Sequence, residues 1–112
     1  MWRDKMLLGD KKMTIDEMQK QIWQNKLDKH FNITNVEQEF NYLRGEVDEA
    51  YDAWKNQKDD FGLELADVAI YLMSLAQMNG LNLGEQIEKK IAINKKRVYV
   101  MENGKLVKKI ME

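Results

Sequence analysis

The sequence predicts an all-α protein of four helices, followed by a short C-terminal β-hairpin. The 112 residues include no proline, eight methionines and 44% apolar residues, which favours helix along the whole chain. Polar capping patterns precede the amphipathic stretches, and the pairs Asn79-Gly80 and Asn103-Gly104 interrupt them. A chain of this length forms a single domain, residues 1–112, whose core is thin, so we expect further burial between subunits.

The first helix is expected over about residues 15–29. Residues 1–12 lack an apolar period and are expected to form a loose arm. Thr14-Ile15-Asp16-Glu17 is a capping box that opens the helix. His30, the only histidine, follows its end and has no partner visible in the sequence. It is expected to have a structural role.

The second helix is expected over about 35–56, after a second capping box at Thr34-Asn35-Val36-Glu37. Gly45 lies within it, at a cost of about 1 kcal/mol relative to alanine, and suggests close packing. The helix has an apolar stripe that is expected to face the core: Val36, Phe40, Leu43, Val47, Ala50 and Trp54.

The third helix is expected over residues 61–78, with Asp59 or Asp60 as its cap and Asn79-Gly80 as its stop. It is apolar nearly all round, and Glu64 and Asp67 are its only charged residues. Helices of that kind are normally buried.

The fourth helix is expected from Asn82-Leu83-Gly84-Glu85 to about residue 97, with Leu83, Ile87 and Ile91 inward. The pattern then changes from the helical period to β-prone residues on both sides of Asn103-Gly104. Asn-Gly between such residues is the strongest short-range hairpin signal, so a hairpin is predicted within residues 98–110. A frayed helical tail is the alternative.

Two pairs of acidic residues at helical spacing are the main chemical signal. Residues three apart share a helix face, so Glu46 and Glu49 project together, as do Glu64 and Asp67. An antiparallel turn between the helices would bring all four carboxylates to similar depth. Buried carboxylates require a cation, and oxygen ligands without His or Cys favour Mg²⁺ or Mn²⁺. The sequence therefore predicts a divalent-metal site.

The distribution of charge narrows the classes of partner. The net charge is −1, but residues 37–67 hold ten acidic against three basic residues, whereas residues 86–109 hold eight basic against two acidic. An acidic segment beside a basic one suits a metal-bound polyphosphate, and two solvated faces are the alternative. A stable nucleic-acid partner is not expected for so balanced a chain. Without cysteine, a signal-peptide core or a membrane-length apolar stretch, the protein is expected to be cytoplasmic.

Three segments resemble the MazG-like all-α nucleoside triphosphate pyrophosphohydrolases, over roughly residues 14–99. The first metal helix of that family is similar to LRGEVDEAYDAW at 43–54. Its second helix and following turn are similar to LELADVAIYLMSLAQMNGLNL at 63–83. Its closing basic segment is similar to KKIAINKKRVY at 89–99.

The resemblance implies a four-helix core that assembles as a dimer or a dimer of dimers. It implies Mg²⁺-dependent hydrolysis of a (d)NTP to (d)NMP and pyrophosphate, as in nucleotide-pool house-cleaning. By motif position it assigns four metal ligands: Glu46, Glu49, Glu64 and Asp67. Glu46 or Glu49 would be the general base. The residues expected to contact nucleotide or phosphate are Asn94, Lys95, Lys96 and Arg97.

Aromatic residues are expected to hold the base. Tyr71 matches an aromatic that lines the base pocket in the dCTP-preferring branch of the family, and Trp54 and Trp23 are further candidates. One departure concerns the metal. Gly45 stands where many members have an additional acid, which leaves the number of metal ions open.

Two other functions are compatible with the sequence. A non-enzymatic helical dimer, serving as an interaction or regulatory module, would use the same apolar faces. A pyrophosphohydrolase of the same superfamily acting on another substrate, such as phosphoribosyl-ATP, would use the same acids. A di-iron carboxylate bundle is disfavoured, because those sites use Glu-x-x-His pairs and His30 lies in no such pair.

Overall fold

The computed structural model describes residues 12–109, which form four helices and one two-stranded antiparallel sheet. The helices are α1 (Ile15–Lys29), α2 (Val36–Lys55), α3 (Phe61–Met78) and α4 (Leu83–Lys96); the strands are β1 (Val98–Glu102) and β2 (Lys105–Lys109). The prediction of a mainly helical chain that ends in a hairpin is confirmed. The arm predicted at residues 1–12 lies outside the described residues, except for Lys12.

The helix boundaries follow from the caps. Thr14 and Glu17 form the predicted capping box, and Asn82 accepts a hydrogen bond from the Glu85 amide at the start of α4. The second capping box was predicted one residue too early. The cap of α2 is Asn35, whose side chain accepts from the Gln38 amide. Asp60 precedes α3 but makes no capping hydrogen bond with its side chain.

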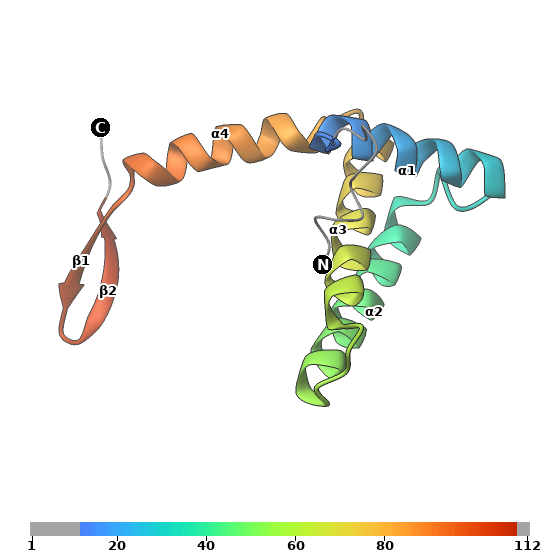
Figure 1. Ribbon diagram of the computed structural model, residues 1–112. Helices are drawn as coiled ribbons and strands as arrows, with labels where there is room; N and C mark the ends of the chain where they lie inside the picture. The colour runs from blue at the N-terminus through green and yellow to red at the C-terminus, as the bar shows by residue number, and fades with distance from the viewer. Residues whose placement is uncertain (1–11, 110–112) are drawn as a thin grey trace.

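α2 and α3 form an antiparallel pair, and α1 crosses the end of that pair at the α3–α4 turn (Figure 1). The buried amide of Gln19 holds this junction together. It donates to Gln77 and to the Leu81 carbonyl, at 3.0 and 2.8 Å, and accepts from the Leu83 amide at 3.0 Å. Because Gly84 has no side chain, α4 can begin close to Ile15 of α1.

α4 does not join the other three helices as a fourth member of a bundle. It contacts α1 and α3 only near its start and then leads away from them, with the β-hairpin at its far end (Figure 1). Ile87 and Ile91, which were expected to point inward, are therefore exposed within the chain. The amphipathic pattern is real, but its apolar face has no intramolecular partner in the described part of the chain.

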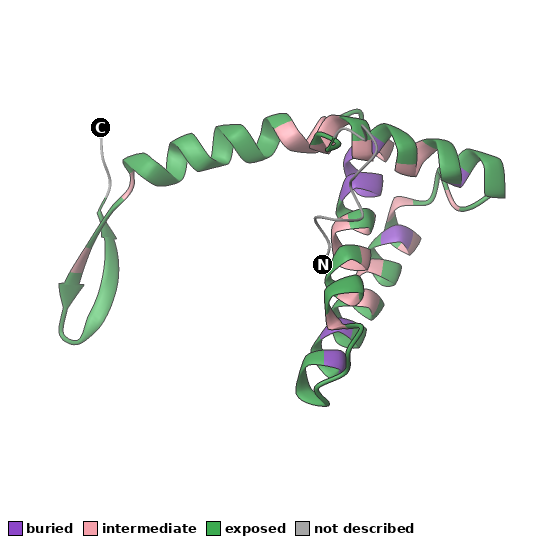
Figure 2. Ribbon diagram, viewed as in Figure 1, coloured by how far each residue is buried: buried purple, intermediate pink, exposed green. Residues whose placement is uncertain are grey.

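The outer face of α2 is also uncovered (Figure 2). The residues of α2 that pack against α3 include Ala50 and Ala53, whereas much of the apolar stripe expected in the core faces solvent. We call its exposed apolar side chains the outer stripe of α2: Phe40, Val47, Tyr51 and Trp54. These residues are spaced by seven, four and three positions and so share one helix face, as in a helix–helix interface.

The chain is extended for its size. Its radius of gyration is 17.9 Å, against about 13 Å for a compact domain of this length. Its accessible surface is 9385 Å², against roughly 6,500 Å² for a compact 13.3-kDa monomer. The single chain thus leaves much apolar surface in water.

The sequence was expected to lack a membrane-length apolar stretch, but among the described residues α3 has the length and apolar composition of a membrane-crossing helix. Core helices of water-soluble proteins share those properties. α3 packs along α2, but only 22% of it is buried within one chain, so the burial expected of this helix is incomplete. Leu63 and Leu65, for example, are exposed.

Candidate functional site

Three of the four predicted metal ligands converge between α2 and α3. One carboxylate oxygen from each of Glu46, Glu64 and Asp67 lies within 4.8 Å of the other two. The antiparallel pairing of α2 with α3 produces this cluster, because it sets the two acidic helix faces opposite each other at similar depth. All three residues are partly buried.

Two oxygens of this cluster have no hydrogen-bond partner in the described part of the chain. They are Oε2 of Glu46 and Oε2 of Glu64, and both are removed from solvent. A buried carboxylate oxygen without a partner is costly, and a bound cation would satisfy such oxygens. The donor set is entirely carboxylate, which fits Mg²⁺ or Mn²⁺.

Burial and, after it, repulsion between like charges raise the pKa of two carboxyl groups of the cluster. Burial is the largest cause that raises the pKa of Glu46 from 4.5 to about 7, followed by a hydrogen bond to Glu49 and repulsion from its charge. Repulsion from Asp67 and Glu64 acts in the same direction. Burial also raises the pKa of Glu64, aided by the charges of Asp60, Glu49 and Asp67. A divalent cation would reverse these effects.

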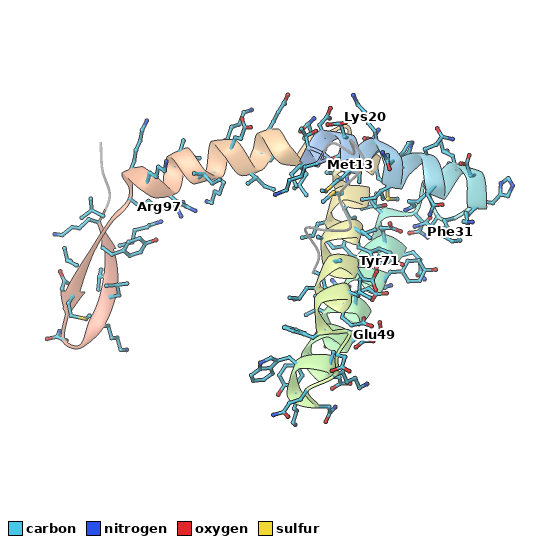
Figure 3. All side chains as sticks on the ribbon, viewed as in Figure 1. Met13, Lys20, Phe31, Glu49, Tyr71 and Arg97 are labelled. Carbon is cyan, nitrogen blue, oxygen red and sulfur yellow. The ribbon has the colours of Figure 1, made fainter. Side chains whose placement is uncertain are left out.

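Glu49, the fourth predicted ligand, lies beside the cluster rather than within it. It is exposed, one helical turn from Glu46, and its charge acts on both Glu46 and Glu64. Figure 3 shows Glu49 on α2 near the α2–α3 turn, with Tyr71 farther along toward α1. Glu49 is therefore not one of the three carboxylates that converge, although its charge acts on two of them.

A cavity of about 740 Å³ adjoins the carboxylates. Glu46 and Asp67 line one part of it, and residues of α1 and the α1–α2 loop line another, among them Asn25 and Asn32. The predicted aromatic Tyr71 lines the cavity, and its ring contacts that of Tyr42 at a centroid distance of 6.0 Å. The space has the size of small-molecule sites in proteins and combines aromatic with amide side chains.

The cavity also contains a buried polar network that the sequence did not reveal. The Lys26 ammonium donates to Glu39 at 2.5 Å and to Ser74 at 2.6 Å, and Ser74 donates to Glu39. Asn32 donates to the other Glu39 oxygen at 3.1 Å. Helical spacing carried a signal for this network, because Glu39 lies seven residues before Glu46 and Ser74 seven after Asp67.

The two tryptophans that were predicted to hold the base do not line this cavity. Trp54 is 60% exposed, contacts Tyr51, and borders a separate hollow at the α2–α3 turn. Trp23 is partly buried, with the Lys26 ammonium 5.7 Å from its ring. Their predicted part in base binding has no support from their placement within one chain.

The basic residues are far from the carboxylates of their own chain. Asn94, Lys95 and Lys96 lie in the last turn of α4, and Arg97 follows, donating to Asn94 at 3.2 Å. Figure 3 places Arg97 at the far end of α4, away from Tyr71 and Glu49. α4 makes no contact with α2 in the described structure. One chain therefore does not bring its basic segment to its own acidic site.

Gly45 stands beside Glu46 in open space. A Cβ atom added there would meet nothing within 4 Å. The close packing expected of this glycine is absent among residues 12–109, where the position has room for a further side chain.

Comparison with known proteins gives no relative: no family model, no curated protein and no solved structure matches this chain. Membership of the MazG-like family stays a prediction from the motifs.

Proposed function

We propose that the protein is a Mg²⁺-dependent pyrophosphohydrolase that cleaves a nucleoside triphosphate to the monophosphate and pyrophosphate. The observation that carries this proposal is the position of the carboxylates: Glu46, Glu64 and Asp67 converge at one side of a nucleoside-sized cavity, and two of their oxygens are buried without partners. A triphosphate whose base enters the cavity would have its phosphates at the acidic cluster.

The roles of the residues follow from this orientation. Metal ions held by the cluster would supply charge neutralisation for the triphosphate and acidify a water molecule. Glu46 or Glu49 accepts the proton of the water that attacks the α-phosphorus, and the bond to the bridging oxygen breaks with release of pyrophosphate. The ring of Tyr71 stacks on the base. The amide of Asn25, which lines the cavity, would hydrogen-bond base or sugar, whereas the Asn32 amide is already bonded to Glu39 and to the Asn35 backbone.

A second copy of the chain is part of the proposal. The leaving pyrophosphate requires cations, yet Lys95, Lys96 and Arg97 extend away from their own carboxylates. The same segment from another copy would complete the site, and the extended shape and exposed apolar faces favour such an assembly. We therefore propose a homodimer, or a tetramer built from it, with basic residues supplied in trans.

The test is a panel of canonical and modified (d)NTPs incubated with Mg²⁺, with phosphoribosyl-ATP included, in which pyrophosphate and phosphate are measured separately. Release of pyrophosphate that is lost in Glu46→Gln, Glu64→Gln and Asp67→Asn, and retained in Glu37→Gln, supports the proposal. Glu37 lies exposed at the start of α2, away from the cluster, and serves as the control. Release of phosphate alone would reject the proposed bond cleavage.

The exposed outer stripe of α2 favours one other function, a helical interaction module without catalysis. That function predicts self-association with no pyrophosphate release from any member of the panel. It also predicts no effect of Mg²⁺ on thermal stability, because the carboxylates would then have no ligand role.

A further inference from the structure

The C-terminal hairpin is the part of the chain with the least support from its own fold. β1 and β2 pair with each other, Val100 opposite Val107 and Met101 opposite Leu106, and neither strand contacts a helix within the described residues. An isolated two-stranded hairpin is at best marginally stable in water. We call α4 together with the hairpin the C-terminal arm. A well-formed hairpin at the end of this arm therefore indicates that another surface covers it.

One face of the hairpin is suited to be covered. Side chains alternate between faces along a strand, so Tyr99, Met101, Leu106 and Lys108 lie on the same side. We call this the Met101 face. Met101 and Leu106 are 67% and 65% exposed, the most exposed apolar side chains of the two strands, and Tyr99 is 48% exposed beside them. Apolar residues that are adjacent and this exposed mark an interaction site.

Charge indicates which surface the hairpin contacts. From Lys95 to Lys109 the arm holds six basic residues and only Glu102 as an acid, whereas α2 and the turn after it are strongly acidic. The outer stripe of α2 is apolar. Asp48 lies about one helical turn before Tyr51 at its border, and the Lys55 ammonium lies 5.9 Å from the Tyr51 ring. The outer stripe therefore offers apolar contact for Met101 and Leu106 together with a carboxylate for Lys108.

The lengths of the hairpin and of α2 allow the hairpin to reach the outer stripe of a second copy of the chain. The hairpin follows Arg97 directly, and a five-residue strand spans about 17 Å. Trp54 lies eight residues beyond Glu46 on α2, a rise of about 12 Å. An arm that brings Arg97 to the carboxylates of another copy thus has its hairpin within reach of that copy's outer stripe. The chain's own α2 is not available to it (Figure 1).

We propose that the Met101 face of the hairpin packs on the outer stripe of α2 in a second copy of the chain, so that the hairpin acts as a clasp between subunits. The inference shares with the proposed function the idea that the arm reaches another copy, but it requires no catalysis. The surface of the chain exceeds that of a compact monomer by roughly 2,900 Å², ample for the roughly 800 Å² per partner of a standard interface.

The test compares two neighbouring substitutions on opposite faces of β2. Leu106→Lys places a charge on the Met101 face, and Val107→Lys places the same charge on the other face. Self-association is measured by sedimentation over a range of concentrations, with circular dichroism as the check on helix content. We expect the dimer dissociation constant to rise about tenfold or more in Leu106→Lys and to change little in Val107→Lys. Equal effects, or none, would overturn the clasp.

Disulfide formation provides a second measurement that does not depend on affinity. The chain has no cysteine, so Met101→Cys and Trp54→Cys can be introduced in separately tagged chains and co-assembled. A mixed disulfide between the two tags is expected, with Val107→Cys in place of Met101→Cys as the negative control. Met101–Met101 cross-links without the mixed product would instead mean hairpin-to-hairpin pairing and would refute the proposal.

The two proposals fail in different ways. Loss of assembly in Leu106→Lys with no pyrophosphate release from the wild-type protein would retain the clasp and reject the enzyme. Pyrophosphate release from the wild-type protein, with no mixed disulfide and with unchanged assembly of Leu106→Lys, would retain the enzyme and reject the clasp.

Discussion

The ammonium of Lys26 in α1 lies 2.5 Å from the carboxylate of Glu39 in α2, and the two side chains are only 8% and 1% exposed. The pair joins two helices that make little other contact, because α1 packs mainly on α3. It also borders the cavity next to Tyr71. A buried ion pair thus helps to hold α1 over the cavity.

We expect Lys26→Met to destabilise the protein by about 3 kcal/mol, because Glu39 would be left buried without its cation. Urea unfolding measures the change in free energy. Lys29→Met, an exposed lysine on the same helix, should change it by less than about 0.5 kcal/mol. The double variant Lys26→Met/Glu39→Gln should recover part of the loss, and a double variant as unstable as the sum of its parts would argue against the pair.

Mg²⁺ should raise the thermal stability of the protein, because it binds a carboxylate cluster that the unfolded chain lacks. A concentration one hundred times the dissociation constant corresponds to about 2.7 kcal/mol. Glu64→Gln should melt higher than wild type without Mg²⁺, since repulsion in the cluster falls, and should respond less to Mg²⁺. Calorimetry with Mg²⁺ and with EDTA tests both statements. Equal Mg²⁺ responses in the variant and wild type would exclude Glu64 as a ligand.

The metal-free protein should lose stability as the pH rises from about 4.5 to 7. The pKa of Glu46 is raised to about 7 in the folded state, so between these values the folded chain binds more protons than the unfolded chain does. Its stability therefore falls with increasing pH. Solvent screening limits the effect to about 1 kcal/mol. Glu46→Gln should reduce the slope measured by unfolding in EDTA, and a slope unaltered by this substitution would contradict the assignment.

Tyr71→Ala should raise KM for the preferred nucleotide about tenfold or more, because a stacking surface for the base is lost. Tyr71→Phe keeps the ring and should stay close to wild type. Steady-state kinetics with pyrophosphate detection separates KM from kcat. A loss confined to kcat in Tyr71→Ala would place the ring at the reacting phosphates instead.

Much of the local structure was predictable, because it depends on short-range chemistry. Thr14 with Glu17, and Asn82 with its helix, identified two helix starts. Asn103 and Gly104 both adopt positive φ, at 51° and 76°, as the tight hairpin turn requires. The convergence of Glu46, Glu64 and Asp67 followed from helical spacing and an antiparallel turn.

The remainder was not predictable from one sequence, because an apolar stripe does not specify its partner. The stripe that includes Val47 and Trp54 has the same period whether it packs inside the chain or against another chain. The same holds for Ile87 and Ile91 in α4. The Lys26–Glu39 pair was not predicted, because lysine and glutamate side chains on helices usually remain in water. Nothing in the sequence shows that these two face each other across α1 and α2.

The direction in which α4 leaves the fold has a consequence for how such a protein behaves on dilution. If the cations that stabilise the departing pyrophosphate arrive on a neighbour's arm, then each separated chain holds only half of a working centre. Turnover per chain would then rise with protein concentration and level off once pairing is complete.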